Sequence, residues 1–487
     1  MKLHDLLRDT GLVADAIDTD REITAITCDS RRIEPGCLFV CIPGTRTDGH
    51  RYAADAERDG AAAIVVQRDL GLRTQLLTDN ARRTWAQICA NWFGRPSERL
   101  HLIGVTGTNG KTTTTTLVKS MLEYAGHKVG LIGTVCDMVG DRVLPAEHTT
   151  PDSYDLQSML ALMVVEQCDY CVMEVSSHAL DQQRVAGCFY DIGAFTNLTQ
   201  DHLDYHGTME NYLQAKKRLF SMCRTGVVNI DDPHAAQMMA GESCPFVTFA
   251  VDDDRADFVA RNVRHRADGV GFELVGTGHI GRVQMPIPGQ FSVYNGLTAA
   301  AICLAAGMPF DDVVAALCRV HGVKGRAEVV PTGRDLTVVI DYAHTPDGLQ
   351  NICRTLGECC GGRLVTLFGC GGDRDRGKRP QMGKIAADLS DFVVVTSDNP
   401  RSEEPGAIIA DILDGMRDTK TPYTVIEDRV QAIHWAIAHA QPGDTLLLAG
   451  KGHETYQILR DGVIHLDERE VVADALRGTA ENEKSGK

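Results

Sequence analysis

A glycine-rich turn runs straight into a lysine and a row of threonines in the stretch GVTGTNGKTTT, residues 104–114. Glycines allow backbone N–H groups to turn inward on a polyphosphate, and a helix start adds partial positive charge there. We therefore predict a phosphate-binding loop in which Lys111 neutralises the outer phosphates and the Thr112 hydroxyl can ligate Mg²⁺. The other loop residues expected at the nucleotide are Gly107, Thr108, Asn109, Gly110 and Thr113.

The spacing departs from that of a standard phosphate loop. In that motif a glycine stands five residues before the Gly-Lys pair, whereas this chain has Val105 there, between Gly104 and Gly107. The flanking segments are nevertheless typical, because an apolar run precedes the turn and a segment rich in leucine and methionine follows it. We therefore favour a nucleoside triphosphate site over a chance glycine-rich turn.

A carboxylate closes the apolar run YCVMEV, residues 170–175. Burial of a lone carboxylate such as Glu174 is costly unless a cation compensates it. A Mg²⁺ shared with Thr112 and the phosphates would do so, and a salt bridge to a core Arg or Lys is the alternative. We favour the metal, because an acid at the end of a strand after a phosphate loop is a common arrangement.

A lysine lies in the middle of an apolar helical face in the segment MENYLQAKKRLF, residues 209–220. Apolar residues precede and follow Lys216 at spacings of three and four, while Lys217 lies at the edge of the face. Lys216 either extends its amine to solvent or is held in a polar pocket. In a pocket, desolvation would lower its pKa and leave a reactive amine.

Composition limits the possible classes of protein. The 487 residues predict two to four domains, and the net charge of 49 − 66 = −17 argues against a nucleic-acid-binding protein. The sequence predicts no membrane span and no signal peptide, so we expect a cytoplasmic protein. The 16 cysteines are scattered through apolar runs, and we interpret the single C-x-x-C at Cys168 and Cys171 as structural.

Hydrophobic patterning predicts an α/β fold of three domains. Residues 1–98 read as a small N-terminal α/β unit whose polar loops suit an anionic ligand, and residues 99–328 as a central P-loop-type ATPase domain with a parallel sheet. Residues 329–487 alternate regularly between strands and helices, which predicts a Rossmann-like doubly wound domain. Because ligands bind beyond the carboxyl ends of such strands, the charged loops there are expected to form a site. These loops are 341–344, 371–376, 398–401 and 450–454.

Seven ordered motifs resemble those of the Mur ligase family. They are GVTGTNGKTTT, EVSSHAL, DHLDYHGTMENYLQAKKRLF, DYAHTPDGL, GCGGDRDRGKRP, DNPRSEEP and GKGHETYQ. The resemblance runs from about residue 27 to residue 456. It implies a three-domain enzyme of peptidoglycan precursor synthesis that depends on ATP and Mg²⁺. In this family a carboxylate takes the γ-phosphoryl group of ATP to give an acyl phosphate, which an amine attacks through a tetrahedral intermediate.

The resemblance also implies roles for individual residues. It makes Lys111, Glu174, His202 and Lys216 catalytic, with Thr112, Glu174 and His202 as Mg²⁺ ligands. Lys216 would be carbamylated, as N6-carboxylysine, and would hold a second Mg²⁺. Further nucleotide contacts are expected from Asn295, Arg326, Asp341 and His344, and contacts to the UDP-linked substrate from Ser30, Gly44, His50, Thr149, Thr150, Ser176, Gln182 and Arg184.

The incoming amine is expected to bind in the C-terminal loops. The residues implied are Arg374, Asp398, Asn399, Pro400, Arg401, Gly450 and Glu454. Arg401 offers a fork for a second carboxylate, and Asp398 and Glu454 can pair with ammonium. We therefore expect meso-2,6-diaminopimelate as the amine and UDP-N-acetylmuramoyl-L-alanyl-D-glutamate as its acceptor, in a monomeric enzyme with no nucleic-acid partner.

Four alternatives stay open. A lysine-adding ligase of the same family would prefer a residue other than arginine at position 401. Folylpolyglutamate synthetases resemble the same core, but they lack the N-terminal unit and the DNPR loop. Sibling ligases that add D-glutamate or D-alanyl-D-alanine are disfavoured by the same loop. A P-loop switch protein would hydrolyse ATP without stimulation by any amino acid.

Overall fold

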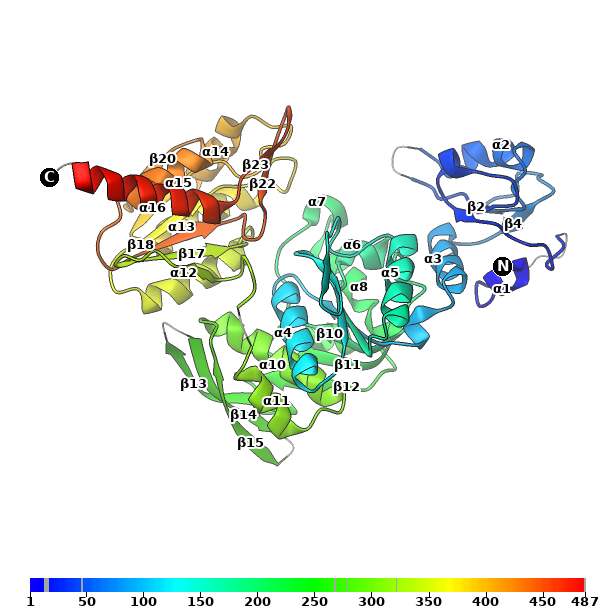
Figure 1. Ribbon diagram of the computed structural model, residues 1–487, viewed down its shortest axis with the longest axis horizontal. Helices are drawn as coiled ribbons and strands as arrows, with labels where there is room; N and C mark the ends of the chain where they lie inside the picture. Colours follow the sequence, from blue (N-terminus) through cyan, green and yellow to red (C-terminus); the bar gives the residue numbers. More distant parts are fainter. Residues whose placement is uncertain (13–16, 45–46, 267–268, 277, 321, 486–487) are drawn as a thin grey trace.

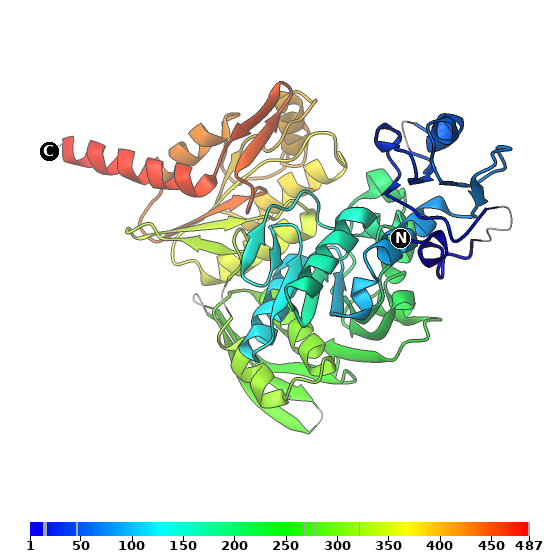
Figure 2. The same cartoon turned by 45° about the vertical axis from the view of Figure 1, so that its right-hand side comes forward.

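The chain forms three α/β domains, each with its own sheet. The computed structural model describes residues 1–12, 17–44, 47–266, 269–276, 278–320 and 322–485. In both views the N-terminal and C-terminal domains flank the central domain (Figures 1 and 2). The expected three-domain α/β architecture is confirmed. The exact boundaries after residues 98 and 328 stay predictions, and β16 (Glu328–Val330) already pairs within the C-terminal sheet.

The N-terminal domain has a four-stranded parallel sheet in the order β1-β2-β3-β4. Its strands are β1 (Ile26–Thr27), β2 (Leu38–Val40), β3 (Ala63–Val66) and β4 (Gln75–Leu77), and its helices are α1 (Leu3–Leu6), α2 (Ala53–Arg58) and α3 (Ala81–Trp92). Three apolar runs predicted β1 to β3. The short β4 went unpredicted because one of its three residues is exposed.

The central domain has an eleven-stranded sheet whose middle part is parallel. Its strands are β5 (His101–Thr106), β6 (Val129–Ile132), β7 (Asp137–Val139), β8 (Arg142–Leu144), β9 (Tyr170–Glu174), β10 (Tyr190–Phe195), β11 (Cys223–Asn229), β12 (Phe246–Ala250), β13 (Phe258–Arg266), β14 (Gly269–Gly276) and β15 (His279–Met285). The order is β15-β14-β13-β12-β11-β10-β5-β9-β6-β7-β8, so the strand that carries the phosphate loop, β5, lies inside the sheet. Antiparallel strands extend both edges.

Helices cover both faces of the central sheet. They are α4 (Lys111–Tyr124), α5 (Ser153–Val165), α6 (Ser177–Asp181), α7 (Leu203–His206), α8 (Met209–Lys217), α9 (Ala235–Met239), α10 (Gln290–Ala305) and α11 (Phe310–Leu317). One core packs α4, α10 and α11 against the sheet, and a second core packs α5, α6 and α8 against the other face. The last turn of α8, which carries Lys216, reaches the phosphate loop at the end of β5.

The C-terminal domain is the predicted doubly wound unit. Its six-stranded sheet has the order β16-β17-β21-β18-β19-β20, parallel except for β16. The strands after β16 are β17 (Leu336–Asp341), β18 (Leu364–Phe368), β19 (Phe392–Val395), β20 (Tyr423–Val425) and β21 (Asp444–Ala449), followed by a hairpin of β22 (Tyr456–Leu459) and β23 (Gly462–His465).

Helices of the C-terminal domain divide between the two faces of its sheet. They are α12 (Pro346–Cys359), α13 (Lys378–Leu389), α14 (Pro405–Asp414), α15 (Arg429–Ala438) and α16 (Glu468–Ser485). The first three share one core, and α15 and α16 share the other. Among the described residues, no helix has both the length and the apolar character that a membrane span requires.

Candidate active site between the domains

The phosphate loop joins β5 to α4 as predicted. Gly107 and Gly110 adopt φ of 149° and 86°, in the region that favours glycine. A Cβ on Gly107 would lie 1.9 Å from the Oγ1 of Thr196, and one on Gly110 would lie 2.4 Å from the Oδ1 of Asn295. The glycines therefore permit both the turn and the close approach of β10 and α10.

Two lysines converge on the carbonyls of this loop. The Nζ of Lys111 donates to Gly107 O at 2.8 Å and to Thr108 O at 2.9 Å, and the Nζ of Lys216 donates to Gly107 O at 2.7 Å. Burial lowers the pKa of Lys111, and burial together with the nearby Lys111 lowers that of Lys216 far below its usual value. Of the two fates considered for Lys216, the structure has the polar pocket, because the residue is only 1% exposed.

Glu174 ends β9 inside the same cavity. Its carboxylate accepts from the Thr134 backbone N–H at 2.8 Å and from the Thr134 hydroxyl at 3.0 Å. No described Arg or Lys forms an ion pair with it, so the core salt bridge considered above is absent from the described residues. The buried Glu174 carboxylate therefore has only neutral donors among the described residues, and its oxygens face a cavity in which a cation could compensate its burial.

His202 and Asp201 lie together at the start of α7. His202 adopts the left-handed φ of 53°, and its backbone N–H donates to Oδ1 of Asp201 at 2.9 Å. Burial lowers the pKa of His202 well below 6.5, which leaves a neutral imidazole. Burial opposes ionisation of Asp201, but His202, His344 and Lys378 outweigh it and lower its pKa. Asp201 escaped the sequence analysis, although it lies in the motif that contains His202.

These groups line a cavity of about 180 Å³ beside the phosphate loop. Most of its lining residues were predicted for the site: Thr108, Asn109, Gly110, Lys111, Thr112, Thr113, Thr149, Glu174, Ser176, His202, Lys216, Arg326 and His344. The structure thus brings together residues from four of the seven motifs, with Thr149 and Arg326 in addition. Thr134, Asp201, Tyr212 and Tyr342 also line the cavity and were not predicted.

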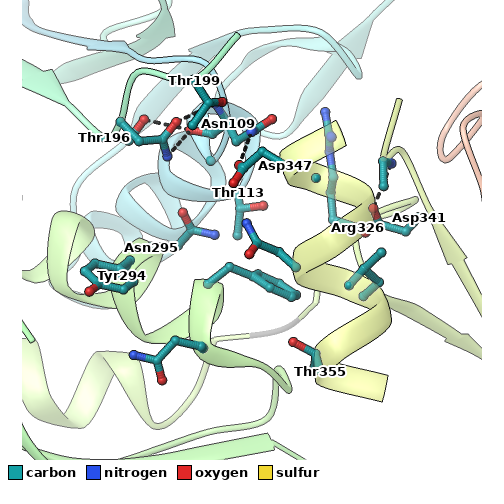
Figure 3. Close-up of a pocket in the computed structure, with 18 of the residues that line it drawn as sticks. Asn109, Thr113, Thr196, Thr199, Tyr294, Asn295, Arg326, Asp341, Asp347 and Thr355 are labelled. Carbon is teal, nitrogen blue, oxygen red and sulfur yellow. Dashed lines mark hydrogen bonds between the residues drawn. The ribbon is translucent and has the colours of Figure 1, made fainter. Parts of the chain in front are cut away.

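A second cavity of about 540 Å³ opens between the central and C-terminal domains. Figure 3 shows Tyr294 and Asn295 on one side of it, and Asp347 and Thr355 of α12 on the other. The Nδ2 of Asn109 donates to Oδ2 of Asp347 at 2.8 Å across the two domains. The size and position of the cavity, at the mouth of the phosphate loop, suit a nucleoside.

Arg326 links the two cavities. Its Nη2 donates to the Thr112 hydroxyl at 3.1 Å, and its guanidinium lies 4.6 Å from the ring centroid of Tyr342. Its Nε is buried and has no hydrogen-bond partner among the described residues. Asp341, as predicted, lines the nucleoside cavity, and its carboxylate accepts from the backbone N–H groups of Ala327 and Ala343.

A third cavity, of about 960 Å³, lies between the N-terminal and central domains. Gly44, Gln182 and Arg184 line it, together with Arg31, Arg32 and Arg82, which the sequence analysis did not select. Four carboxylates also line it, and Asp29 and Asp152 pair with Arg31 and Arg184. Arg32 and Arg82, which have no ion pair among the described residues, are therefore the arginines available to an anionic ligand.

Three residues predicted for the UDP-linked substrate line neither this cavity nor the one beside the phosphate loop. Ser30 begins a short 3-10 helix whose N-cap is Asp29. The His50 side chain is fully buried, and its two ring nitrogens contact Oδ1 of Asp48 at 2.6 Å and the Gln67 backbone N–H at 2.9 Å. The Thr150 hydroxyl donates to Glu174 O at 2.9 Å, and this hydrogen bond holds the end of β9. His50 and Thr150 therefore hold loops in position.

The loops after β19 and β21 meet at the carboxyl edge of the C-terminal sheet. Asn399 donates from Nδ2 to the Glu454 carboxylate at 2.9 Å, and Lys451 donates to both, at 3.0 Å each. Lys451 is fully buried and also lies 4.0 Å from the Asp398 carboxylate. Lys451 therefore links the two predicted loops, although it was not itself selected from the sequence.

Arg401 and Arg374 lie beside this cluster. The Nη1 of Arg401 donates to Gly372 O at 2.8 Å, and its Nε and Nη2 have no hydrogen-bond partner among the described residues. Burial and the nearby Arg374 lower the pKa of Arg401. Pro400 precedes Arg401 in the loop, and a Cβ on Gly450 would lie 2.5 Å from Oδ2 of Asp398. All seven predicted amine-site residues thus belong to one edge of the sheet.

The linker to the C-terminal domain packs against one of these loops. A Cβ on Gly325, whose φ is +70°, would lie 2.2 Å from the backbone N of His453, and one on Gly452 would lie 2.7 Å from Gly325 O. Backbone therefore meets backbone at this point, one residue before Arg326.

Comparison with known proteins bears directly on this architecture. The chain is 46% identical over 487 residues to UDP-N-acetylmuramoyl-L-alanyl-D-glutamate--2,6-diaminopimelate ligase of Syntrophomonas wolfei, covering 98% of this chain and 99% of that protein. The chain belongs to the Mur ligase family. Family models for a Mur ligase catalytic domain, middle domain and glutamate ligase domain match residues 22–85, 105–303 and 325–452 of this Mur ligase.

Further comparisons agree with this assignment. A ligase of the same name from Caldanaerobacter subterraneus is 47% identical over 467 residues, or 95% of this Mur ligase and 96% of the relative. A solved structure of a UDP-N-acetylmuramoyl-L-alanyl-D-glutamate--2,6-diaminopimelate ligase matches with a TM-score of 0.72 and 30% identity over 99% of both chains. MurF of Thermotoga maritima, solved in complex with ADP, shares the fold with a TM-score of 0.63 at 17% identity, covering 97% of this chain and 100% of that one.

Proposed function

We propose that this Mur ligase joins meso-2,6-diaminopimelate to the D-glutamate γ-carboxylate of UDP-N-acetylmuramoyl-L-alanyl-D-glutamate. ATP drives the reaction, which belongs to peptidoglycan precursor synthesis. The relatives named above that are 46% and 47% identical carry this activity in their names. The observation that carries the proposal is the position of Arg401, whose fork lies beside the acidic cluster of Asp398 and Glu454.

Activation of the carboxylate explains the need for ATP. A carboxylate oxygen attacks the γ-phosphorus, the bond to the β-phosphate oxygen breaks, and ADP leaves behind an acyl phosphate. Lys111 and the guanidinium of Arg326 both contact the phosphate loop and the start of α4, where they would stabilise charge on the transferring phosphoryl group.

The amine then attacks the acyl carbon. A tetrahedral intermediate forms, inorganic phosphate leaves, and the nitrogen loses a proton to give the amide. Burial disfavours the charged form of His202, so this imidazole suits a metal ligand better than an acceptor of that proton.

The residues at the phosphate loop fit Mg²⁺. Among the described residues, no three His, Cys, Asp or Glu side chains are placed to hold a metal alone. Magnesium in nucleotide sites takes one or two protein carboxylates and completes its shell with phosphate oxygens and water. The cation-free Glu174, the Thr112 hydroxyl and the neutral His202 supply such a donor set. Bound Mg²⁺ would neutralise phosphate charge during transfer.

Lys216 would serve this site as a carbamate. Its burial and lowered pKa favour the free amine, which adds CO₂ to give a carboxylate and releases a proton. That carboxylate would face the same cavity as Glu174 and could hold a second Mg²⁺. The short distance from Nζ to Gly107 O places the modification against the phosphate loop.

The three cavities accommodate two of the three substrates of the proposed reaction, whereas the amine would bind at the C-terminal loops, outside all three. The arginine-rich cavity between the first two domains suits the UDP end, and the cavity between the last two suits adenosine. Thr149 and Ser176 line the phosphate-loop cavity, whereas Gln182 and Arg184 line the UDP cavity. They are therefore the residues that would border the muramoyl-dipeptide. We propose that the enzyme is active as a monomer. We place it in the cytoplasm, where ATP is available.

Phosphate release tests this proposal. It should be measured with ATP, Mg²⁺ and UDP-N-acetylmuramoyl-L-alanyl-D-glutamate in the presence of meso-diaminopimelate, L-lysine or no amino acid. We expect stimulation by diaminopimelate alone. Stimulation by lysine would instead favour the lysine-adding ligase, and indifference to every amino acid would favour a nucleotide switch.

A further inference from the structure

A buried ion pair joins two helix starts in the C-terminal domain. Arg429 is the first residue of α15 and Glu468 the first of α16, and they are 1% and 0% exposed. The Glu468 Oε1 accepts from Arg429 Nε at 2.9 Å and lies 2.7 Å from its Nη2. Neither residue lines the cavities described above.

The remaining donors of this guanidinium reach two carbonyls at the edge of the sheet. Nη2 of Arg429 donates to Ala449 O at 2.8 Å, and Nη1 donates to Ser397 O at 3.2 Å. Ala449 ends β21 and precedes Gly450, whereas Ser397 directly precedes Asp398. One side chain thus holds the starting points of both loops that form the proposed amine site.

We infer that Arg429 and Glu468 are positioning residues that set the distance between loops 398–401 and 450–454. The inference rests on the proposed function, because it assigns the amine substrate to these loops. Arg401 and Asp398 belong to one loop and Glu454 to the other, so their mutual distance follows from the positions of Ser397 and Ala449. The amine substrate carries charged groups at both ends of a short chain, and their simultaneous recognition requires that the two loops be held at a suitable distance.

Stability alone does not explain this pair. A buried ion pair is costly to desolvate, and apolar residues of similar volume often serve stability equally well. The Oε2 of Glu468 is also buried with no hydrogen-bond partner among the described residues. The planar guanidinium, in contrast, bonds three acceptors on three separate segments at once, which a lysine ammonium cannot reproduce with the same geometry.

The same strand offers a matched control. Arg363 and Asp444 form an ion pair at the opposite end of β21, with Nη2 and Oδ2 separated by 2.6 Å and the Asp444 side chain 2% exposed. Arg363 also donates to a backbone carbonyl, His439 O at 3.2 Å. This pair therefore resembles the Arg429–Glu468 pair in its hydrogen bonds, but it lies at the amino-terminal edge of the sheet, away from loops 398–401 and 450–454.

The test compares Arg429→Lys and Glu468→Gln with Arg363→Lys in the full-length enzyme. For each variant the KM values for meso-diaminopimelate, ATP and the UDP-linked substrate are measured, together with kcat and Tm. Hydroxylamine added without amino acid traps the acyl phosphate as a hydroxamate and so reports activation alone. We expect the first two variants to raise the KM for diaminopimelate about tenfold. Their KM for ATP and their hydroxamate rate should stay within about twofold of wild type.

Two results would overturn the inference. One is an equal rise of all three KM values with a parallel loss of hydroxamate. The other is the same selective rise in Arg363→Lys, which would indicate a general effect of destabilisation. If Arg429→Lys fails to fold, the test rests on Glu468→Gln, which keeps the side-chain volume. That variant must then raise the KM for diaminopimelate without raising the KM for ATP.

Failure of the proposed function has a different signature. Wild-type enzyme would then form the hydroxamate without any product from diaminopimelate. In that event the KM comparison is made with L-lysine, and the absence of product from both amines would remove the inference together with the proposed function.

Discussion

The Nζ of Lys378 lies 3.9 Å from Oδ1 of Asp201, so an ammonium of the C-terminal domain faces a carboxylate of the central domain. His344 approaches the same carboxylate, with Nε2 at 4.0 Å from Oδ2. Next to this pair, Gln200 donates to Asp375 at 3.5 Å. Since Asp201 neighbours His202, contacts between the domains reach directly into the active site.

Loss of the ammonium at position 378 should weaken the nucleotide site. We expect Lys378→Met to raise the KM for ATP about fivefold to tenfold, because the apparent affinity falls with the fraction of molecules in the binding-competent arrangement. Lys384→Met is the control, since Lys384 lies on the same helix in an exposed pair with Asp388. Initial rates of phosphate release provide the measurement, and equal effects of the two variants would contradict a role for Asp201 and Lys378.

Removal of the Lys216 amine should abolish ligation. The proposed carbamate would be lost in Lys216→Ala, and added short carboxylates such as acetate should restore part of the activity by occupying its place. Lys217→Ala is the matched control, because Lys217 instead contacts Ala240 O and the Glu242 carboxylate. Ligation is followed by product chromatography. An unimpaired Lys216→Ala enzyme would exclude this residue from the site.

Replacement of Arg401 should act selectively on the amine substrate. Arg401 has a left-handed φ of 52°, which asparagine tolerates better than alanine. Arg401→Asn therefore tests the loss of the guanidinium with little added backbone strain. We expect the KM for diaminopimelate to rise about tenfold to hundredfold, the value of a charge-assisted hydrogen bond. The KM for ATP should change little.

A neighbouring arginine provides the control for this experiment. Arg460 contacts Glu404 and Ser402 O close to the same loop but is 59% exposed at its side chain. Arg460→Asn should leave both KM values near those of wild type. Equal rises in the KM for diaminopimelate and the KM for ATP in Arg401→Asn would contradict the assigned role.

Acid should destabilise the protein partly through His453. Burial, with Arg326 and Arg469 nearby, lowers the pKa of His453 to about 3, and its Nδ1 is buried without a partner among the described residues. Unfolded histidine has a pKa of about 6.5, so the neutral ring stabilises the fold above that pH. As the pH falls through 6.5 toward 3, the unfolded chain binds a proton that the native chain excludes, and this stability is lost.

Urea unfolding at two pH values measures this effect. Between pH 7 and pH 5.5 the free energy of unfolding should fall by about 1 kcal/mol more in wild type than in His453→Gln. His434→Gln, at an exposed position on α15, should keep the wild-type slope. Identical slopes in all three proteins would show that His453 titrates normally in the folded state.

Much of the fold was predictable because its parallel strands are continuous apolar runs. The strands β17 to β21 alternate with amphipathic helices, and each was expected within a few residues. The strands β13 to β15 were not resolved individually by the pattern. β15, for example, begins with the exposed His279 and Ile280, and only its last residues include the buried Val283 and Met285. Such edge strands carry less signal than strands covered on both faces.

The candidate site was predictable where chemistry depends on residue type within one segment. Glycine spacing indicated the phosphate loop, and the apolar face around Lys216 indicated a pocket. The partners of Asp201 were not accessible to this reasoning, because Lys378 and His344 come from another domain. His50 shows the converse, since its polar loop suggested a ligand but its ring is bound by Asp48 and Gln67.

The backbone contact between Gly325 and Gly452 connects loop 450–454 to the phosphate loop through one side chain, that of Arg326. A displacement of loop 450–454 presses on Gly325, and the next residue, Arg326, bonds Thr112. We therefore expect a coupling free energy between the two sites, measurable as a change in ADP affinity when the amino acid is present. By thermodynamic reciprocity, ADP must then change the affinity for the amino acid by the same factor.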